Sequence, residues 1–239
     1  MGRSAGVGRV QSVQANRKVF VTSLWLIALG ATAGSAAAQG VGGGLRIGTP
    51  GVGLELGGHV TDRFGIRGLV NGGSVSYDYD ESGIRYEGKF RFGTGFLLAD
   101  WHPYASGFRF TGGLAYNNQR FEGTARPGSG TININGTPYS AAQVGSLDAQ
   151  VRFSKASPYL GVGWGLAPRA GSRLYFSADL GVMYQRPSAT LTGTCGPALP
   201  ASVCTQLQSD IRAEEAEFRD AADELRFYPV ISVGFGVRF

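Results

Sequence analysis

The sequence predicts an all-β fold: an eight-stranded antiparallel transmembrane β-barrel with one short helix in an outer loop. Three observations predict it, namely segments in which bulky apolar residues alternate with small or polar ones, an N-terminal export signal, and long connections at one end of the barrel. Glycine is also frequent, with 39 among 239 residues. Inward-facing glycines would leave room in a narrow lumen for large side chains elsewhere.

Residues 1–38 have the pattern of a cleaved secretory signal peptide. Four basic residues precede an uncharged apolar stretch, and Ala36, Ala37 and Ala38 form a small-residue cleavage site before Gln39. An uncleaved membrane anchor is the alternative, but the apolar run is too short to span comfortably. Removing these four from the 22 basic residues leaves 18 against 17 acidic ones, a net charge of +1. The basic character therefore belongs mostly to the signal, and nucleic-acid binding loses its main support.

The mature chain, residues 39–239, is expected to form one domain. Period-two alternation identifies its strands. We expect strands at residues 41–48, 52–60, 64–80, 84–101, 108–124, 149–167, 174–185 and 227–239. The strand at 84–101 is expected to turn Phe96 and Leu98 outward and its charged residues inward. A β-sandwich would show similar alternation, so the export signal and the C-terminal strand decide between the two folds.

The connections divide into two sets, because an even strand count places both termini at the periplasmic end. Short turns at 61–63, 102–107 and 168–173 are expected at that end. The long outer loops are about 126–148 and 187–226, and the second contains an acidic amphipathic helix at 209–226 with Ser209 as its cap. The helix either covers the barrel mouth or binds a partner.

A set of charged residues is expected to point into the lumen of the barrel. An eight-stranded barrel is just wide enough for its own side chains, and unpaired buried charges are costly, so mixed signs favour a salt-bridged plug. A narrow pore is the alternative. The predicted lumen charge network consists of Arg46, Glu55, Arg67, Arg85, Glu87, Lys89, Arg91, Arg109, Arg152, Asp179 and Arg238, with His59 beside them.

Other residues indicate no catalytic or cofactor site. His59 and His102 are the two histidines, and both lie towards predicted periplasmic turns, so a lipid-modifying enzyme would lack its base at the outer leaflet. Cys195 and Cys204 lie in one outer loop and are expected to form a disulfide in an oxidising compartment, since a metal site would need more ligands. We expect no enzyme activity, no cofactor and no metal.

Five segments carry a resemblance to known proteins. They are GTPGVGLEL from Gly48, ADWHP from Ala99, FRFTGGLAYNN from Phe108, SPYLGVGWG from Ser157 and LGVMYQ from Leu180. With the strand pattern, they resemble small eight-stranded outer-membrane barrels of the OmpA transmembrane-domain, OmpW and opacity-protein type, and a set of uncharacterised outer-membrane barrel proteins of proteobacteria. The resemblance implies the fold and a place in a Gram-negative outer membrane.

The two ends of the predicted strands carry further expected roles. Phe235, Val237 and Phe239 resemble the C-terminal signal that the barrel-assembly machinery recognises in such proteins. Interfacial aromatic girdles are expected from Tyr86, Trp101, Tyr116 and Trp164.

The expected function is structural, or surface interaction through the outer loops, by a barrel with a filled, charged lumen in contact with outer-membrane lipids. A narrow channel for ions or small solutes is the alternative.

Overall fold

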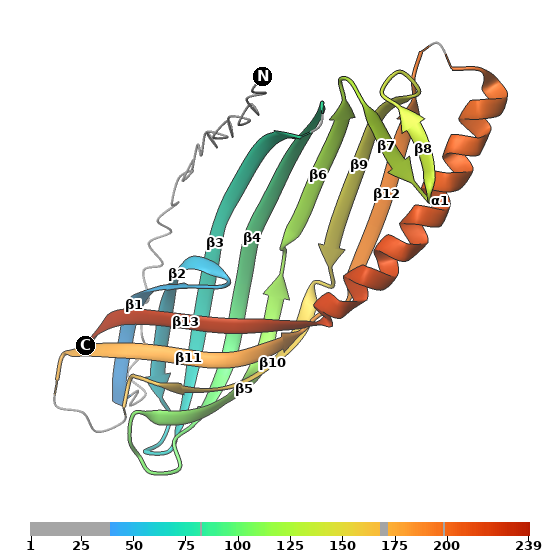
Figure 1. The fold of residues 1–239 in the computed structure, drawn as a ribbon. Coiled ribbons are helices and arrows are strands. Elements are labelled where there is room, and N and C mark those ends of the chain that lie inside the picture. Colours follow the sequence, from blue (N-terminus) through green and yellow to red (C-terminus); the bar gives the residue numbers. More distant parts are fainter. Residues whose placement is uncertain (1–38, 82, 168–171, 198) are drawn as a thin grey trace, which may run out of the picture.

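The computed structural model describes residues 39–81, 83–167, 172–197 and 199–239, and within them the chain is mostly β-structure. The predicted signal peptide lies outside the described residues. Two parts follow from the strand pairing: a closed ring of strands, and a sheet that continues two of those strands beyond the ring (Figure 1).

The ring contains eight strands, and every neighbouring pair is antiparallel, which confirms the predicted fold class. In ring order they are β1 (Gln39–Gly48), β2 (Gly51–His59), β3 (Phe64–Glu81), β4 (Ile84–Trp101), β5 (Phe108–Asn117), β10 (Ala156–Trp164), β11 (Leu174–Tyr184) and β13 (Phe227–Arg238). The first and last strands close the ring from Gly42 opposite Arg238 to Gly48 opposite Ser232.

The ring is apolar outside and small or polar inside. In β13, the side chains of Ile231, Val233 and Phe235 are exposed, whereas Ser232 and Gly234 are buried. The same alternation runs through the neighbouring strands, so a continuous belt of exposed apolar side chains surrounds the ring. Alternation places successive side chains on opposite faces of a strand, and here the apolar set faces away from the lumen.

The extension grows from β3 and β4, which are 18 residues long, compared with 9 residues in β2. Their outer halves leave the ring and pair onward with β6 (Arg120–Pro127), β9 (Val144–Phe153) and β12 (Pro187–Cys195). The extension is therefore a five-stranded sheet in the order β3-β4-β6-β9-β12 (Figure 1).

One face of the extension is covered by helix α1 (Ala201–Ala222) and the hairpin of β7 (Thr131–Ile134) and β8 (Thr137–Ser140). Leu207 and Ile211 of α1 pack on Leu191 and Val144, and Ala222 packs on Val151. The short 3-10 helix η1 (Asp223–Arg226) then leads into β13. No helix in the described parts of the chain is long and apolar enough to cross a membrane.

The structure corrects the predicted loops. Residues 126–148 and 187–226 were expected as loops with one helix, but most of them form the hairpin, β9, β12 and α1. The predicted strand at 108–124 is broken between β5 and β6, because β5 pairs with the inner half of β4 and β6 with its outer half. Helix α1 begins at Ala201 with Pro200 as N-cap, so Ser209 lies inside the helix and does not cap it.

Candidate functional site: the charged lumen

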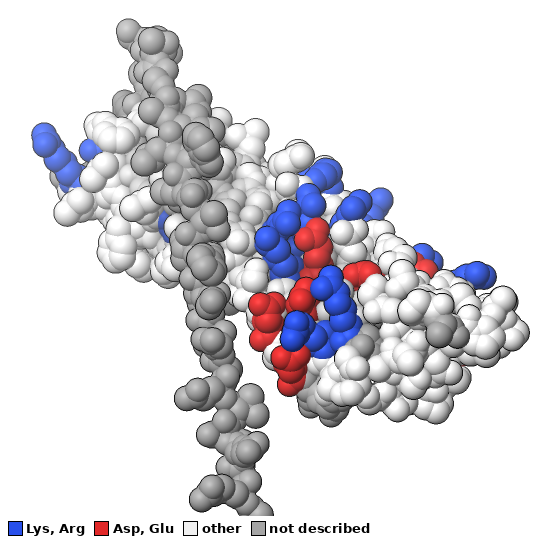
Figure 2. Space-filling view, turned by 90° about the horizontal axis from the view of Figure 1, so that it is seen from above, with Lys and Arg blue, Asp and Glu red and all other residues white. Residues whose placement is uncertain are grey.

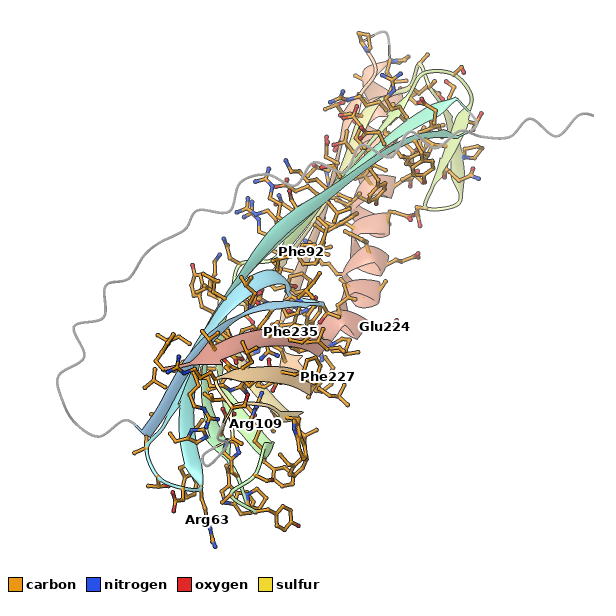
Figure 3. The ribbon with its side chains drawn as sticks, turned by 90° about the vertical axis from the view of Figure 1, so that its left-hand side faces the viewer. Arg63, Phe92, Arg109, Glu224, Phe227 and Phe235 are labelled. Atoms are coloured by element: carbon orange, nitrogen blue, oxygen red, sulfur yellow. A yellow bond between two sulfur atoms is a disulfide. The ribbon has the colours of Figure 1, made fainter. Side chains whose placement is uncertain are left out.

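Six charged side chains meet inside the ring, and each has at most 5% of its side chain exposed. Three are arginines and three are carboxylates, so the charges balance. They come from six strands, because each residue is an inward-facing position of its own strand: Arg46 (β1), Glu55 (β2), Arg67 (β3), Asp100 (β4), Arg109 (β5) and Asp179 (β11). Figure 3 shows Arg109 within the ring.

Arg67 lies at the centre of this lumen network and contacts all three carboxylates. Its Nη1 donates to Glu55 Oε2 at 2.9 Å. Its Nη2 donates to Asp100 Oδ1 at 3.0 Å and to Asp179 Oδ1 at 3.2 Å, and its Nε donates to Asp100 as well. The planar guanidinium group supplies several donors in fixed directions, which suits it to bridging more than one carboxylate.

Arg46 and Arg109 complete the lumen network on either side of Arg67. Arg46 donates to Glu55 and to Asp179, and its Nη2 donates to Ser232 Oγ at 2.6 Å. Arg109 Nη2 donates to both oxygens of Asp179, at 2.8 and 3.0 Å. Every carboxylate in the lumen is therefore held by at least two arginines, counting the 3.7 Å approach of Arg109 Nε to Asp100.

Hydroxyl groups occupy the remaining acceptor sites. Thr111 Oγ1 donates to Asp100 Oδ1 at 2.6 Å, and Tyr175 donates to Glu55 Oε1 at 3.3 Å. Burial of ion pairs is tolerated when the geometry is good and the other lone pairs are also satisfied. The lumen network therefore has no spare charge with which to hold a charged solute.

A glycine on β10 makes the close packing around Asp179 possible. A Cβ built on Gly163 would lie 2.3 Å from Asp179 Oδ1 and 2.8 Å from the Ala178 carbonyl oxygen. Real Cβ atoms essentially never approach that closely. The carboxylate thus occupies space that any other residue at position 163 would fill.

An apolar layer fills the lumen next to the charged one, on the side of the extension. Its buried members are Leu69, Phe96, Leu98, Ala115, Tyr159, Met183 and Val230. The rings of Phe96 and Tyr159 meet edge to face, with centroids 5.6 Å apart. A cavity between the two layers measures about 10 Å³. A cavity must offer roughly 10–15 Å³ to hold a single water, so there is room for at most one water between the layers. The two layers therefore close the lumen.

The mouth of the ring on the side of the extension is tied to the 3-10 helix that follows α1. Asn117 Nδ2 donates to Gln185 Oε1 at 2.7 Å, and Gln185 Nε2 donates to the carbonyl oxygen of Leu225 in η1 at 3.0 Å. Both amide side chains are at most 1% exposed.

The opposite end of the lumen holds the two histidines. His59 and His102 lie with ring centroids 5.0 Å apart, and both are buried. Their end carries the short turns at 60–63 and 102–107 and is marked by Arg63 in Figure 3. Burial lowers the pKa of His102, whose Nδ1 lies 2.8 Å from the Ser106 carbonyl oxygen. Neutral imidazoles can pack against each other without charge repulsion.

The structure brings together five of the eleven residues expected in the lumen: Arg46, Glu55, Arg67, Arg109 and Asp179. Arg238 lies at the histidine end and donates to the Ala167 carbonyl oxygen.

The other five are placed on the extension, outside the ring. They are Arg85, Glu87, Lys89, Arg91 and Arg152. They lie there because the outer half of β4 pairs with β6, and Arg152 is on β9, which continues that sheet. Within the ring, the even-numbered residues of β4, such as Phe96 and Leu98, face the lumen, and its odd-numbered residues face outward. The expected faces of this strand were therefore reversed.

Asp100 belongs to the site but was not singled out from the sequence; the hydroxyl residues Thr111, Ser177 and Ser232, which lie on inward-facing positions, also join it. Asp100 lies next to Trp101, which is 46% exposed, so an outward tryptophan directs the preceding carboxylate inward. Trp101 was expected in the outward aromatic girdle, and applying that orientation to the rest of the strand would have turned Phe96 and Leu98 inward.

The predicted girdle and C-terminal residues occupy the exterior of the ring, with one exception. Trp101 and Trp164 are exposed near the histidine end of the ring, and Tyr116 is exposed at the opposite end of the ring, where the extension begins. Tyr86 instead lies on the extension and stacks on Tyr79, with centroids 4.8 Å apart. The side chains of Phe235, Val237 and Phe239 are exposed on the outside of the ring.

The predicted disulfide between Cys195 and Cys204 is present in the structure. It joins the end of β12 to the first turn of α1. The helix is thereby attached to the edge strand of the sheet that it covers.

The fold and the lumen together define a small β-barrel with a filled interior and a sheet extension at one end. Its fold is similar to that of two proteins of Acinetobacter baumannii known from crystal structures. CarO2 has a TM-score of 0.59 and 23% identity, over 85% of this chain and 100% of CarO2. CarO has a TM-score of 0.55 and 21% identity, over 85% of this chain and 98% of CarO.

A comparison with models of protein families found no match, and a search of curated proteins found none either. At this level of identity, the likeness to the two crystal structures establishes the fold alone.

Proposed function

We propose that the protein is an outer-membrane β-barrel with a closed lumen, and that its extension acts outside the membrane as a structural or surface-interaction element. The observation that carries this proposal is the pair of layers in the lumen: a neutral ionic network beside an apolar cluster, with a cavity of about 10 Å³ between them. A solute cannot pass without displacing side chains from both layers.

The exterior of the ring supports a position across a membrane. Phe235 is 71% exposed, Leu160 68% and Leu97 66%, and a belt of such residues would aggregate in water. Trp101 and Trp164 at one end and Tyr116 at the other match the aromatic residues found at membrane interfaces. Export through the predicted signal peptide and insertion by the barrel-assembly machinery complete the proposal for localisation.

The extension supports a role at the surface. It has its own cohesive packing, with two buried apolar clusters and a disulfide that fastens α1. A barrel whose role was confined to the membrane would not need a separately packed sheet and helix beyond the ring. We propose no enzymatic role, because the paired histidines lie at the end away from the extension.

A narrow channel is the second candidate. One observation favours it: Arg46 Nε and Asn71 Nδ2, which both line the small cavity, are buried without a hydrogen-bond partner. A water there would satisfy them. Conduction would still require the apolar layer to open.

Planar-bilayer conductance of the purified protein tests the proposal. We expect no unitary currents from the wild type, and currents only when both layers are opened, in the variant Phe96→Ala, Tyr159→Ala, Arg67→Ala, Asp100→Ala, which removes one charge of each sign from the ionic network. The outward Leu97→Ala, Leu160→Ala variant is the matched control and should stay silent. Heat-modifiable gel migration establishes that each protein is folded. Steady unitary currents from the folded wild type would refute the closed barrel and support the narrow channel.

A further inference from the structure

The outer face of the extension is continuous with the apolar outside of the ring. In β4, odd-numbered residues face outward along the whole strand, so Leu97 in the ring and Arg91 in the extension share one face. Helix α1 covers the opposite face, through Phe121 and Val151. Figure 3 shows nitrogen-tipped side chains on the side of the sheet away from α1.

Three arginines lie side by side on this face. The register places Arg91 opposite Arg120, and Arg120 opposite Arg152, on three neighbouring strands. Directly opposed residues have Cβ atoms roughly 4.5–5.5 Å apart, and like charges at that spacing destabilise a sheet. A row of this kind implies a source of negative charge that compensates it.

The protein itself supplies little of that charge. Among the described residues, Glu122 is the carboxylate that the salt bridges pair with this row, and it lies 3.5 Å from Arg91 and 3.6 Å from Arg120. Lys89 is opposite the same glutamate, and the next neighbour of Arg152 is Ser188. Figure 2, which views the molecule from above, shows charged side chains gathered over its middle and Lys and Arg side chains continuing along one edge.

The distance of the arginine row from the end of the apolar belt shows which layer of a membrane would surround it. Tyr116, the outermost aromatic residue on this side of the ring, is opposite Gly95, and Arg91 lies four residues further along β4. Four residues span about 13 Å of strand, or about 10 Å along the membrane normal at the usual barrel tilt. The row is thus level with lipid headgroups. Lys155, whose Nζ lies 5.6 Å from the centre of the Tyr116 ring, marks the boundary between belt and row.

We propose that Arg91, Arg120 and Arg152, with Lys89 and Lys155, form a binding site for the phosphate groups of anionic lipids in the facing leaflet. This inference rests on the proposed position of the ring across the membrane. Arginine binds phosphate through two parallel hydrogen bonds, and adjacent arginines can share one phosphate. The pattern further out on the same face agrees with it, because the next positions include the acidic Glu87 and Asp148, which a headgroup phosphate would repel.

Native mass spectrometry of the protein in neutral detergent micelles tests the site. The probe is an equimolar mixture of phosphatidylglycerol and phosphatidylcholine with identical acyl chains. Both lipids carry a phosphate, but only phosphatidylglycerol has a net negative charge. We expect the wild type to retain phosphatidylglycerol preferentially. The double variant Arg120→Gln, Arg152→Gln should reduce that preference by about twenty-five-fold, at about five-fold for each arginine near an anionic surface.

The control variant Arg85→Gln, Arg126→Gln removes the same charge from the same face, further from the ring, and should keep the preference. An equal loss in both variants would mean a nonspecific charge effect and would overturn the proposal. So would a wild type that shows no preference. If 10 mM inorganic phosphate abolishes the preference for phosphatidylglycerol, the arginine row is a binding site for free phosphate and not for lipid.

The outcomes separate this inference from the proposed function. A folded protein that fails to insert into phosphatidylcholine vesicles would refute the membrane-spanning ring. One that inserts but binds both lipids equally would refute the phosphate site alone.

Discussion

Replacing Arg67 with methionine would leave three buried carboxylates facing two arginines. Glu55, Asp100 and Asp179 would each lose a partner, because Arg67 contacts all of them at 2.9–3.2 Å or closer. Breaking a buried ion pair by removing one partner costs about 3–5 kcal/mol. We expect the free energy of unfolding to fall by about that amount, since the lumen then carries one uncompensated negative charge.

Urea unfolding of the protein in lipid vesicles, followed by tryptophan fluorescence, measures the change. The double variant Arg67→Met, Asp100→Asn restores neutrality and should recover more than half of the loss. Arg85→Met is the exposed control: its partner Asp80 lies 3.3 Å away, but both side chains are more than 60% exposed. That pair should contribute less than about 1 kcal/mol. A cost for Arg67→Met as small as that of Arg85→Met, or a double variant no more stable than the single one, would refute the reasoning.

Three further predictions concern other parts of the molecule. Tyr139 donates to Asp210 at 2.5 Å and lowers the pKa of that carboxyl. The extension should therefore resist proteolysis above about pH 4 and lose this resistance as the pH falls further. Asp210→Asn should make the rate of proteolysis less dependent on pH. Gly163→Ala should destabilise the ring by about 1–3 kcal/mol in urea unfolding, because the methyl group meets a carboxylate, and an unchanged midpoint would contradict the packing. Reducing the bond between Cys195 and Cys204 should cost the extension about 2–3 kcal/mol and speed tryptic cleavage of α1, while heat-modifiable migration of the ring stays the same.

The ring could be predicted from the sequence because each of its strands alternates between two different environments. In β13, bulky residues such as Ile231 and Phe235 alternate with Ser232 and Gly234, so one assignment of faces is clearly better. The same signal placed Arg46, Glu55 and Arg67 in the lumen, where the structure has them.

The extension could not be predicted in the same way, because β3 and β4 pass through two environments without a break in register. From Phe64 opposite Trp101 to Glu81 opposite Ile84 their pairing is continuous. In the ring, the outward face of β4 is apolar; in the extension, the same face is charged. Assigning the faces of β4 by polarity alone therefore exchanges its inward and outward sides. This is why Arg91 was expected in the lumen and Asp100 was missed.

The split of the predicted strand at 108–124 has a related cause. Nothing in the local alternation shows that β5 stays in the ring while β6 leaves it, because both pair with β4. Only the partner strands β9 and β12 reveal the second sheet. Residues 149–153 of β9 were expected at the start of a ring strand at 149–167, which the structure divides into β9 and β10, and β12 was expected within a loop.

If the ring spans a membrane as proposed, the uninterrupted pairing of β3 and β4 also limits how deeply the protein can sit in the bilayer. Because two stiff strands carry an apolar stretch and a basic row at a fixed separation, sinking by a few ångströms would draw Arg91 towards hydrocarbon and rising would expose Leu97 to water. An arginine on the lipid-facing side of a barrel costs about 0–1 kcal/mol near the interface and roughly 2–4 kcal/mol at the midplane, so the cost rises as the row sinks. Under that proposal, the protein would not adapt to a thicker membrane by sliding, and the surrounding lipid would thin to match it.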